Sequence, residues 1–254
     1  MPEPDTYIER SRQAFRDLAR ERGLAAAGVE VRARPLSSEE AIGEPGRRDF
    51  PLLKGKERLV EAVIEGSRGH AFTDSPREFT GSVEELLGLS LKDSRERGLY
   101  LAALNAAFSH AGLVNGTVHC RDDDPERCAD LIAARVGDHF RWQNIGVIGF
   151  NPALVEGLTR RFGPHRLKLT DLDPDNIETE RFGVRIWDGA TRAEELIEWA
   201  DGVLLTGTTL VNGTFDPLWK MMTANRTPAI LFGVTAAAMA HLFGYERLCP
   251  CARG

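Results

Sequence analysis

The residues best suited to chemistry by type and spacing lie just after an apolar run, Gly202 to Leu205. Open α/β sheets bind ligands beyond the carboxyl ends of their strands, so this position favours a binding site. A helix N-cap needs only one short polar side chain, such as Asn212 or Thr214. Because the segment supplies more than one cap requires, we interpret it as a loop that binds a small polar ligand or an anion through hydroxyls and backbone N–H groups. Its predicted site residues are Thr206, Thr208, Thr209, Asn212, Gly213 and Thr214.

Four cysteines form two pairs along the sequence and suggest a metal site. Thiolate is the ligand that zinc, copper(I) and heavier soft metals prefer, and a Cys-x-Cys spacing lets two sulfurs face one cation. The alternative is that Cys128 is a small buried hydrophobe within a helical stretch, and that the pair near the chain end is frayed. The predicted ligands of a transition or heavy metal ion are His119, Cys120, Cys128, Cys249 and Cys251, and His70 is the alternative to His119 as nitrogen donor.

A third candidate site follows the apolar strand predicted at 145–150. The strand contains Gly149 and precedes Asn151, a spacing that resembles a dinucleotide fingerprint lacking some of its glycines. An acidic residue, Asp171 or Asp173, ends the next strand and could accept hydrogen bonds from ribose hydroxyls. This pattern predicts a nucleotide or an S-adenosylmethionine-like ligand. The alternative is a tight strand–helix turn and an aspartate that caps a helix.

Two further polar positions stand out against their surroundings. His70 begins a segment, 69–76, that is rich in His, Thr and Asp and could face a cleft. Asn105 lies among alanines on a predicted helix and needs a partner if it is buried, whether a ligand or a neighbouring segment of the chain. Lys54, Lys56 and Glu57 are typical of a solvated surface. The sequence has no Ser-His-Asp, HExxH or Walker pattern, so it leaves catalysis open.

Hydrophobic periodicity predicts two regions that would position these residues. After residue 140, apolar strands at 145–150, 166–170, 184–187, 202–205 and 228–232 alternate with helices, which indicates a doubly wound parallel sheet of the Rossmann-like class. Before it, a helix at 5–27, strands at 29–33, 59–64 and 69–73, a capping box at Ser82 and a helix at 94–112 indicate an α+β region. We therefore expect domains at 1–140 and 141–254.

Composition narrows the class of protein. The 254 residues are 42% hydrophobic and 28% charged, which is typical of a globular protein, and the net charge of −6 argues against nucleic acid as a partner. No apolar run reaches the ~20 residues needed to span a bilayer, and the acidic N-terminus does not resemble a secretion signal. We expect a cytoplasmic protein with reduced cysteines and no membrane partner; a homo-oligomer stays open.

The segment Thr206-Gly-Thr-Thr-Leu-Val-Asn-Gly-Thr214 and the helix containing Ala102-Ala-Leu-Asn105-Ala resemble the heavy-metal-chelation family. This resemblance extends over residues 10–248. It implies an N-terminal domain like that of enolase, a Rossmann-like C-terminal domain, and a cleft between them with a proposed role in metal binding. It also implies that the threonines, Asn212 and Asn105 line that cleft. The cysteines match no motif of the family.

Three functional hypotheses follow from these patterns. The first is a metal-binding protein in which thiolates hold the ion. In this protein the segment 206–214, which we call the threonine segment, binds an accompanying anion or chelate. The second is an enzyme that uses a nucleotide or an S-adenosylmethionine-like ligand, with Asp171 or Asp173 on its ribose. The third is a non-catalytic scaffold in which the threonine segment is a structural turn.

Overall fold

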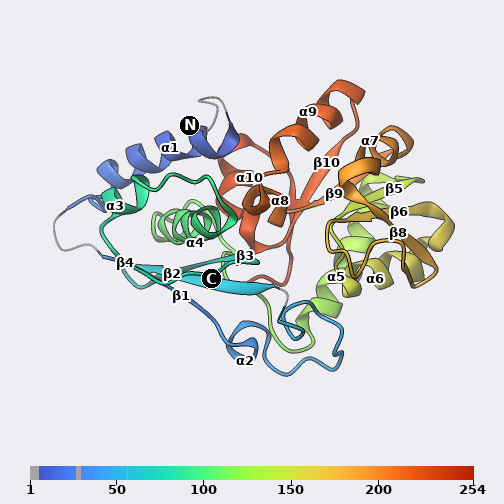
Figure 1. The fold of residues 1–254 in the computed structure, drawn as a ribbon, viewed down its shortest axis with the longest axis horizontal. Coiled ribbons are helices and arrows are strands. Elements are labelled where there is room, and N and C mark those ends of the chain that lie inside the picture. Colours follow the sequence, from blue (N-terminus) through green and yellow to red (C-terminus); the bar gives the residue numbers. More distant parts are fainter. Residues whose placement is uncertain (1–5, 27–29, 56) are drawn as a thin grey trace.

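The computed structural model describes residues 6–26, 30–55 and 57–254, which form two β-sheets with helices packed on them (Figure 1). The strands are β1 (Val31–Pro35), β2 (Arg58–Ile64), β3 (Ser67–Thr73), β4 (Phe79–Gly81), β5 (Ile145–Ile148), β6 (Leu167–Asp171), β7 (Glu180–Arg181), β8 (Val184–Asp188), β9 (Gly202–Thr206), β10 (Ala229–Phe232) and β11 (Arg247–Leu248). The α-helices are α1 (Tyr7–Glu21), α2 (Ser38–Ile42), α3 (Val83–Leu87), α4 (Ser94–His110), α5 (Asp124–Arg135), α6 (Pro152–Phe162), α7 (Gly189–Trp199), α8 (Thr208–Asn212), α9 (Phe215–Asn225) and α10 (Ala237–Phe243). Shorter helical turns are η1 (Val136–Phe140), η2 (Pro164–Arg166) and η3 (Val234–Ala236).

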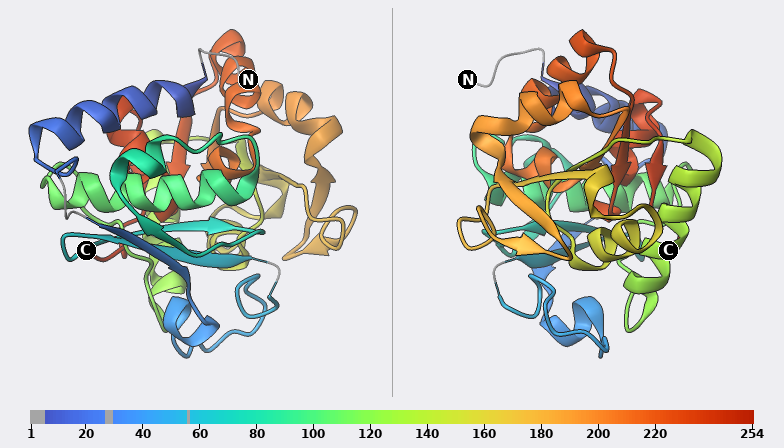
Figure 2. Two further views of the ribbon diagram at one scale, coloured as in Figure 1. Left: turned by 60° about the vertical axis from the view of Figure 1, so that its left-hand side comes forward. Right: turned by 90° about the vertical axis from the view of Figure 1, so that its right-hand side faces the viewer.

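The first sheet is antiparallel, with the strand order β3-β2-β1-β4, and α4 lies on it. Close packing explains the run of alanines in α4. A Cβ atom on Gly69 of β3 would lie 2.3 Å from the carbonyl oxygen of Ala102 and 2.3 Å from the backbone nitrogen of Ala106. Helix α1 covers the other side of α4, where the Ser11 and Tyr100 hydroxyls are 2.9 Å apart (Figure 2).

The second sheet has the order β11-β10-β9-β5-β6-β8-β7, and all of its pairs are parallel except β7 with β8. From β5 the chain moves outward through β6 to β8, and it then returns to β9 on the other side of β5. The strand order therefore reverses between β5 and β9, which is the switch point where open α/β sheets form a ligand crevice. This reversal places the threonine segment after β9 beside the turn after β5.

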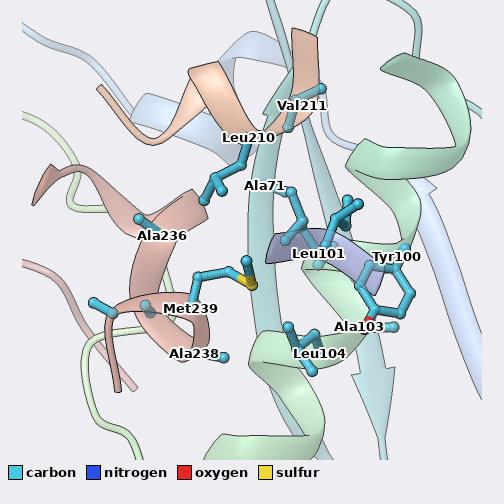
Figure 3. Packing of buried hydrophobic residues seen from close by; sticks show 14 of the residues in the cluster. Ala71, Tyr100, Leu101, Ala103, Leu104, Leu210, Val211, Ala236, Ala238 and Met239 are labelled. Atoms are coloured by element: carbon cyan, nitrogen blue, oxygen red, sulfur yellow. The ribbon is translucent and has the colours of Figure 1, made fainter. Parts of the chain in front are cut away.

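The largest apolar cluster is shared by the two sheets. It joins buried residues of β3 and α4 to residues of α8, η3 and α10, including Leu104, Leu210 and Met239 (Figure 3). A second cluster packs α5 and α6 against the opposite face of the parallel sheet. The two sheets thus lie on either side of residue 140 in the sequence, but they share one apolar cluster. The division into domains at residue 140 stays a prediction.

The α/β architecture with a parallel sheet is confirmed, and the structure corrects several local expectations. The threonine segment is not an extended loop, because it contains α8. The glycines and prolines of the region 35–51 predict a long loop, but the region contains α2, which begins with a capping box between Ser37 and Glu40. The helix expected at 5–27 ends at Glu21, and residues 5 and 27–29 lie outside the described residues. The capping box at Ser82 is confirmed. Across the described ranges, no helix is both long and apolar enough to cross a membrane.

Candidate ligand cleft and thiol cluster

A cleft of about 960 Å³ opens at the carboxyl edge of the parallel sheet. Its walls come from both parts of the chain, since Leu52 and Phe72 line it together with Leu154 and Phe232. The structure brings most of the predicted site residues to this cleft: Gly149, Asn151, Asp171, Asp173, Thr206, Thr208, Thr209, Asn212, Thr214, His119, Cys120, Cys128 and Cys249. It does not place Gly213, Asn105, His70 or Cys251 among the lining residues.

The hydroxyls after β9 are held by short local hydrogen bonds. The Thr206 and Thr208 hydroxyls are 3.1 Å apart, and the Thr209 hydroxyl donates to the Thr206 carbonyl at 2.7 Å. The Thr214 hydroxyl donates to the Asn212 side-chain oxygen at 2.7 Å. Only the side chains of this segment are then positioned to meet a ligand.

Several backbone N–H groups of this segment already have acceptors within the protein, and anion binding by the segment stays a prediction. The N–H groups of Gly207, Thr208, Leu210, Gly213 and Thr214 all donate to oxygen atoms of the protein. Gly213 serves as the left-handed C-cap of α8, with φ of 85°, beside the Arg97 guanidinium. We therefore assign Gly213 a conformational role.

The turn after β5 is fixed by a glycine and a carboxylate. Gly149 has φ of 94°, and a Cβ there would lie 2.4 Å from Cγ2 of Thr206. Asn151 caps α6 by accepting a hydrogen bond from the Leu154 N–H. The Asp171 carboxylate accepts from the Phe150 N–H at 2.6 Å and from the Asp173 N–H at 2.7 Å. Burial raises the pKa of Asp171 above its usual value. Asp171 thus joins the turn to β6 while it lines the cleft.

The cleft also contains carboxyl groups that sequence analysis missed. Glu57 was expected on a solvated surface, but it lines the cleft, as does Asp74 after β3. Burial, followed by the charges of Asp171, Asp173 and Asp74, raises the pKa of Glu57 to about 7. Hydrophobic periodicity could not reveal this contact, because Glu57 precedes β2 and Asp171 belongs to the other sheet.

The cysteines of both sequence pairs meet in space. Cys128 on α5 and Cys249 both line the cleft, and Cys251 packs against the apolar cluster that contains Cys128. Cys120 is close enough to interact electrostatically with Cys249 and Cys251. All four cysteines are free thiols. The hydrogen bond from Cys128 lowers the pKa of Cys249, whereas burial raises the pKa of Cys120. We call Cys128, Cys249 and Cys251 the thiol cluster.

The three remaining predicted residues are held mainly by the protein itself. The His119 ring donates from Nδ1 to the Ala41 carbonyl at 3.1 Å, and burial lowers its pKa to about 4, so Nε2 keeps a lone pair. His119 is one of the residues that line the cleft. Both ring nitrogens of His70 are occupied, by Glu61 at 3.0 Å and by the His119 N–H at 3.1 Å. Asn105 is fully buried and hydrogen-bonded to backbone groups of two other segments. His70 and Asn105 are thus held by contacts within the protein, and their role in ligand binding stays a prediction.

Comparisons with known proteins agree with the fold. A family model described as DUF364, "Putative heavy-metal chelation", matches residues 134–246, which is less than half of the chain. A DUF364 protein of unknown function from Pyrococcus horikoshii is 15% identical, with a TM-score of 0.51 over 91% of this chain and 80% of that chain. Another, from Desulfitobacterium hafniense, is 17% identical, with a TM-score of 0.48 over 73% of this chain and 72% of that chain. No curated protein matches.

Proposed function

We propose that this chain binds a soft transition or heavy metal ion at the thiol cluster beside the cleft. The observation that carries the proposal is the meeting of Cys128 with Cys249 and Cys251, which are far apart in sequence. Thiolates are the preferred donors for such ions. The description of the matched family, heavy-metal chelation, supports the same class of ligand.

The donor set fits a soft ion by chemistry, but its side chains would have to move to enclose one. Among the described residues, no three His, Cys, Asp or Glu side chains already surround a common point as metal ligands would. Cys249, whose pKa is lowered by the Cys128 hydrogen bond, is the first thiol to offer a thiolate. Binding of the metal ion then releases the Cys128 proton, so the affinity for the metal ion should rise with pH. Cys120, which interacts electrostatically with Cys249 and Cys251, is a further thiol donor, and His119 lines the same cleft.

Cadmium titration of the reduced protein tests this proposal. We expect the ultraviolet charge-transfer absorption of cadmium–thiolate bonds, and a loss of affinity of about tenfold or more in Cys128→Ser, because one strong donor is removed. Thr223→Ser, on the exposed surface of α9, should bind cadmium like the unmodified chain. The proposal fails if the reduced chain gives no thiolate absorption, or if Cys128→Ser with Cys249→Ser keeps full affinity.

A second function is favoured by the turn after β5. We infer that an enzyme ligand of the adenine nucleoside or S-adenosylmethionine type could place its ribose against Asp171, since this carboxylate ends β6 and lines the cleft. The turn lies at the reversal of strand order, where such ligands bind. The carboxyl-rich lining disfavours the pyrophosphate of a dinucleotide, because like charges repel.

Calorimetry with a ligand series separates these possibilities. We expect adenosine and S-adenosylmethionine to bind more tightly than NAD⁺ by about tenfold or more, because each phosphate must approach several carboxylates. Substituting Asp171 would disturb the turn itself, so varying the ligand is the cleaner test. Preferential binding of NAD⁺, or no heat with any of the three, would rule this second function out.

A further inference from the structure

The segment 44–55, between α2 and β2, forms part of the wall of the cleft (Figure 1). Its residues Phe50, Pro51 and Leu52 are among those that line the cleft. Phe50 and Leu52 are also buried in an apolar cluster with residues of α5 and α6, and Cys249 packs against the same cluster. These contacts place the segment beside the thiol cluster, where it can limit access to the cleft.

Few backbone hydrogen bonds join this segment to the rest of the molecule. In the part of the chain that the structure describes, its backbone N–H groups reach backbone oxygens only within the turn 50–54. At its beginning, the Glu44 N–H donates to the Asp122 carboxylate at 3.0 Å. Further on, the Leu52 carbonyl accepts a hydrogen bond from the Ser38 hydroxyl of α2 at 3.0 Å. Displacing the segment would therefore break few backbone hydrogen bonds, which is a property of segments that open locally.

Arg47 provides a polar link between the segment and the second sheet. Its guanidinium makes two hydrogen bonds to Asp49, at 2.6 and 2.9 Å, and a third to Glu156 of α6 at 2.7 Å. The Arg47 Cζ atom lies 5.5 Å from the centre of the Phe50 ring and 5.7 Å from that of Phe182, in the turn between β7 and β8. The Arg47 side chain is only 15% exposed, so water screens these interactions less than those of a fully exposed pair. Asp49 thus orients the guanidinium, and Glu156 and Phe182 anchor it outside the segment.

We propose that the segment 44–55 is a lid over the cleft and that Arg47 is the latch that holds it closed. With the latch in place, Phe50 stays packed in the apolar cluster that it shares with α5 and α6. When Arg47 leaves Glu156, the lid can move away from these helices and admit a molecule to the cleft. This inference goes beyond the proposed metal function, because the lid would control access for any ligand of the cleft.

The rate at which thiols in the cleft react with the chromogenic disulfide dithionitrobenzoate tests the lid. Cys120 and Cys128 line the cleft and are only 5% and 8% exposed, so a reagent of this size reaches them when the cleft opens. In the reduced full chain with EDTA, we expect these thiols to react about three- to tenfold faster in Arg47→Gln and in Glu156→Gln, because the closed position loses a part-buried ion pair. Glu156→Gln keeps the Arg47 bonds to Asp49, so an effect common to both variants assigns the latch to the pair.

Arg160→Gln is the matched control, because it removes an exposed ion pair with Asp130 from the same helix, α6; its thiols should react within about twofold of the rate in the unmodified chain. Hydrogen exchange followed by mass spectrometry separates lid opening from a general loss of stability, since exchange should become faster within 44–55 and stay unchanged in α4. The proposal is overturned if neither Arg47→Gln nor Glu156→Gln raises the thiol rate by more than about twofold, or if exchange becomes faster throughout the chain. Since no metal ion is added, these results are independent of the cadmium titration at the thiol cluster.

Discussion

Replacing Asn105 with alanine is expected to destabilise the protein by about 3–5 kcal/mol, because several buried backbone groups would lose their partner. The Asn105 amide nitrogen donates to the carbonyl oxygens of His70 at 2.9 Å and Val234 at 3.1 Å, and the amide oxygen accepts from the Ala238 N–H at 2.8 Å. No water can replace these contacts without opening the core, since Asn105 has no exposed surface.

Equilibrium unfolding in urea measures this loss. Asn225→Ala is the matched control, because Asn225 is exposed on α9 and donates only to the Met221 carbonyl; we expect it to change stability by less than about 0.5 kcal/mol. A loss below about 1 kcal/mol in Asn105→Ala would mean that the backbone groups find other partners, contrary to our argument. The Asn105 bonds connect α4 with β3 and with η3 and α10, so the variant should also weaken the wall of the cleft.

The positions that sequence analysis placed correctly share a physical reason. Carboxyl ends of parallel strands meet at one edge of a sheet, so the sequence alone predicts that Gly149, Asp171 and Thr206 lie close together. All three line the cleft. The capping box at Ser82 is a local pattern within four residues, and such patterns need no knowledge of the fold. The family resemblance added the cleft between the two parts of the chain, which the lining residues support.

The positions that were missed depend on contacts between distant segments. Glu57 lies in an irregular segment before β2, where periodicity carries no signal, and only the packing of the two sheets brings it to Asp171. His70 lies in the strand predicted at 69–73, but its buried hydrogen bond with Glu61 on β2 could not be predicted from one strand. Likewise, the sequence suggested two cysteine pairs, while the contact of Cys128 with the chain end required β11 to return beside β10.

Glu57 also leads to a pH-dependent prediction whose sign follows from its pKa. Burial and the charges of Asp171, Asp173 and Asp74 raise that pKa from 4.5 to about 7, so the folded chain binds more protons than the unfolded chain between these values. The contribution of Glu57 to the free energy of unfolding is therefore most favourable at low pH, and it falls as the pH rises from about 4.5 to 7. Glu57 is only half-buried, so solvent screens part of this effect. We therefore expect the charged Glu57 to lower the free energy of unfolding by about 1–2 kcal/mol above pH 7, which is less than the whole pKa difference would give.

Glu57→Gln should consequently stabilise the protein by about 1–2 kcal/mol at pH 8 and have little effect at pH values near 4.5, where the native carboxyl is already protonated. Glu40→Gln is the control of opposite sign, because the hydrogen bond from Arg34 lowers the pKa of Glu40 to about 2, and losing that carboxylate should destabilise the protein at pH 8. Urea unfolding at both pH values measures the two differences. If Glu57→Gln were less stable than the unmodified chain at pH 8, a partner would be stabilising the Glu57 carboxylate, contrary to the raised pKa on which this prediction is based.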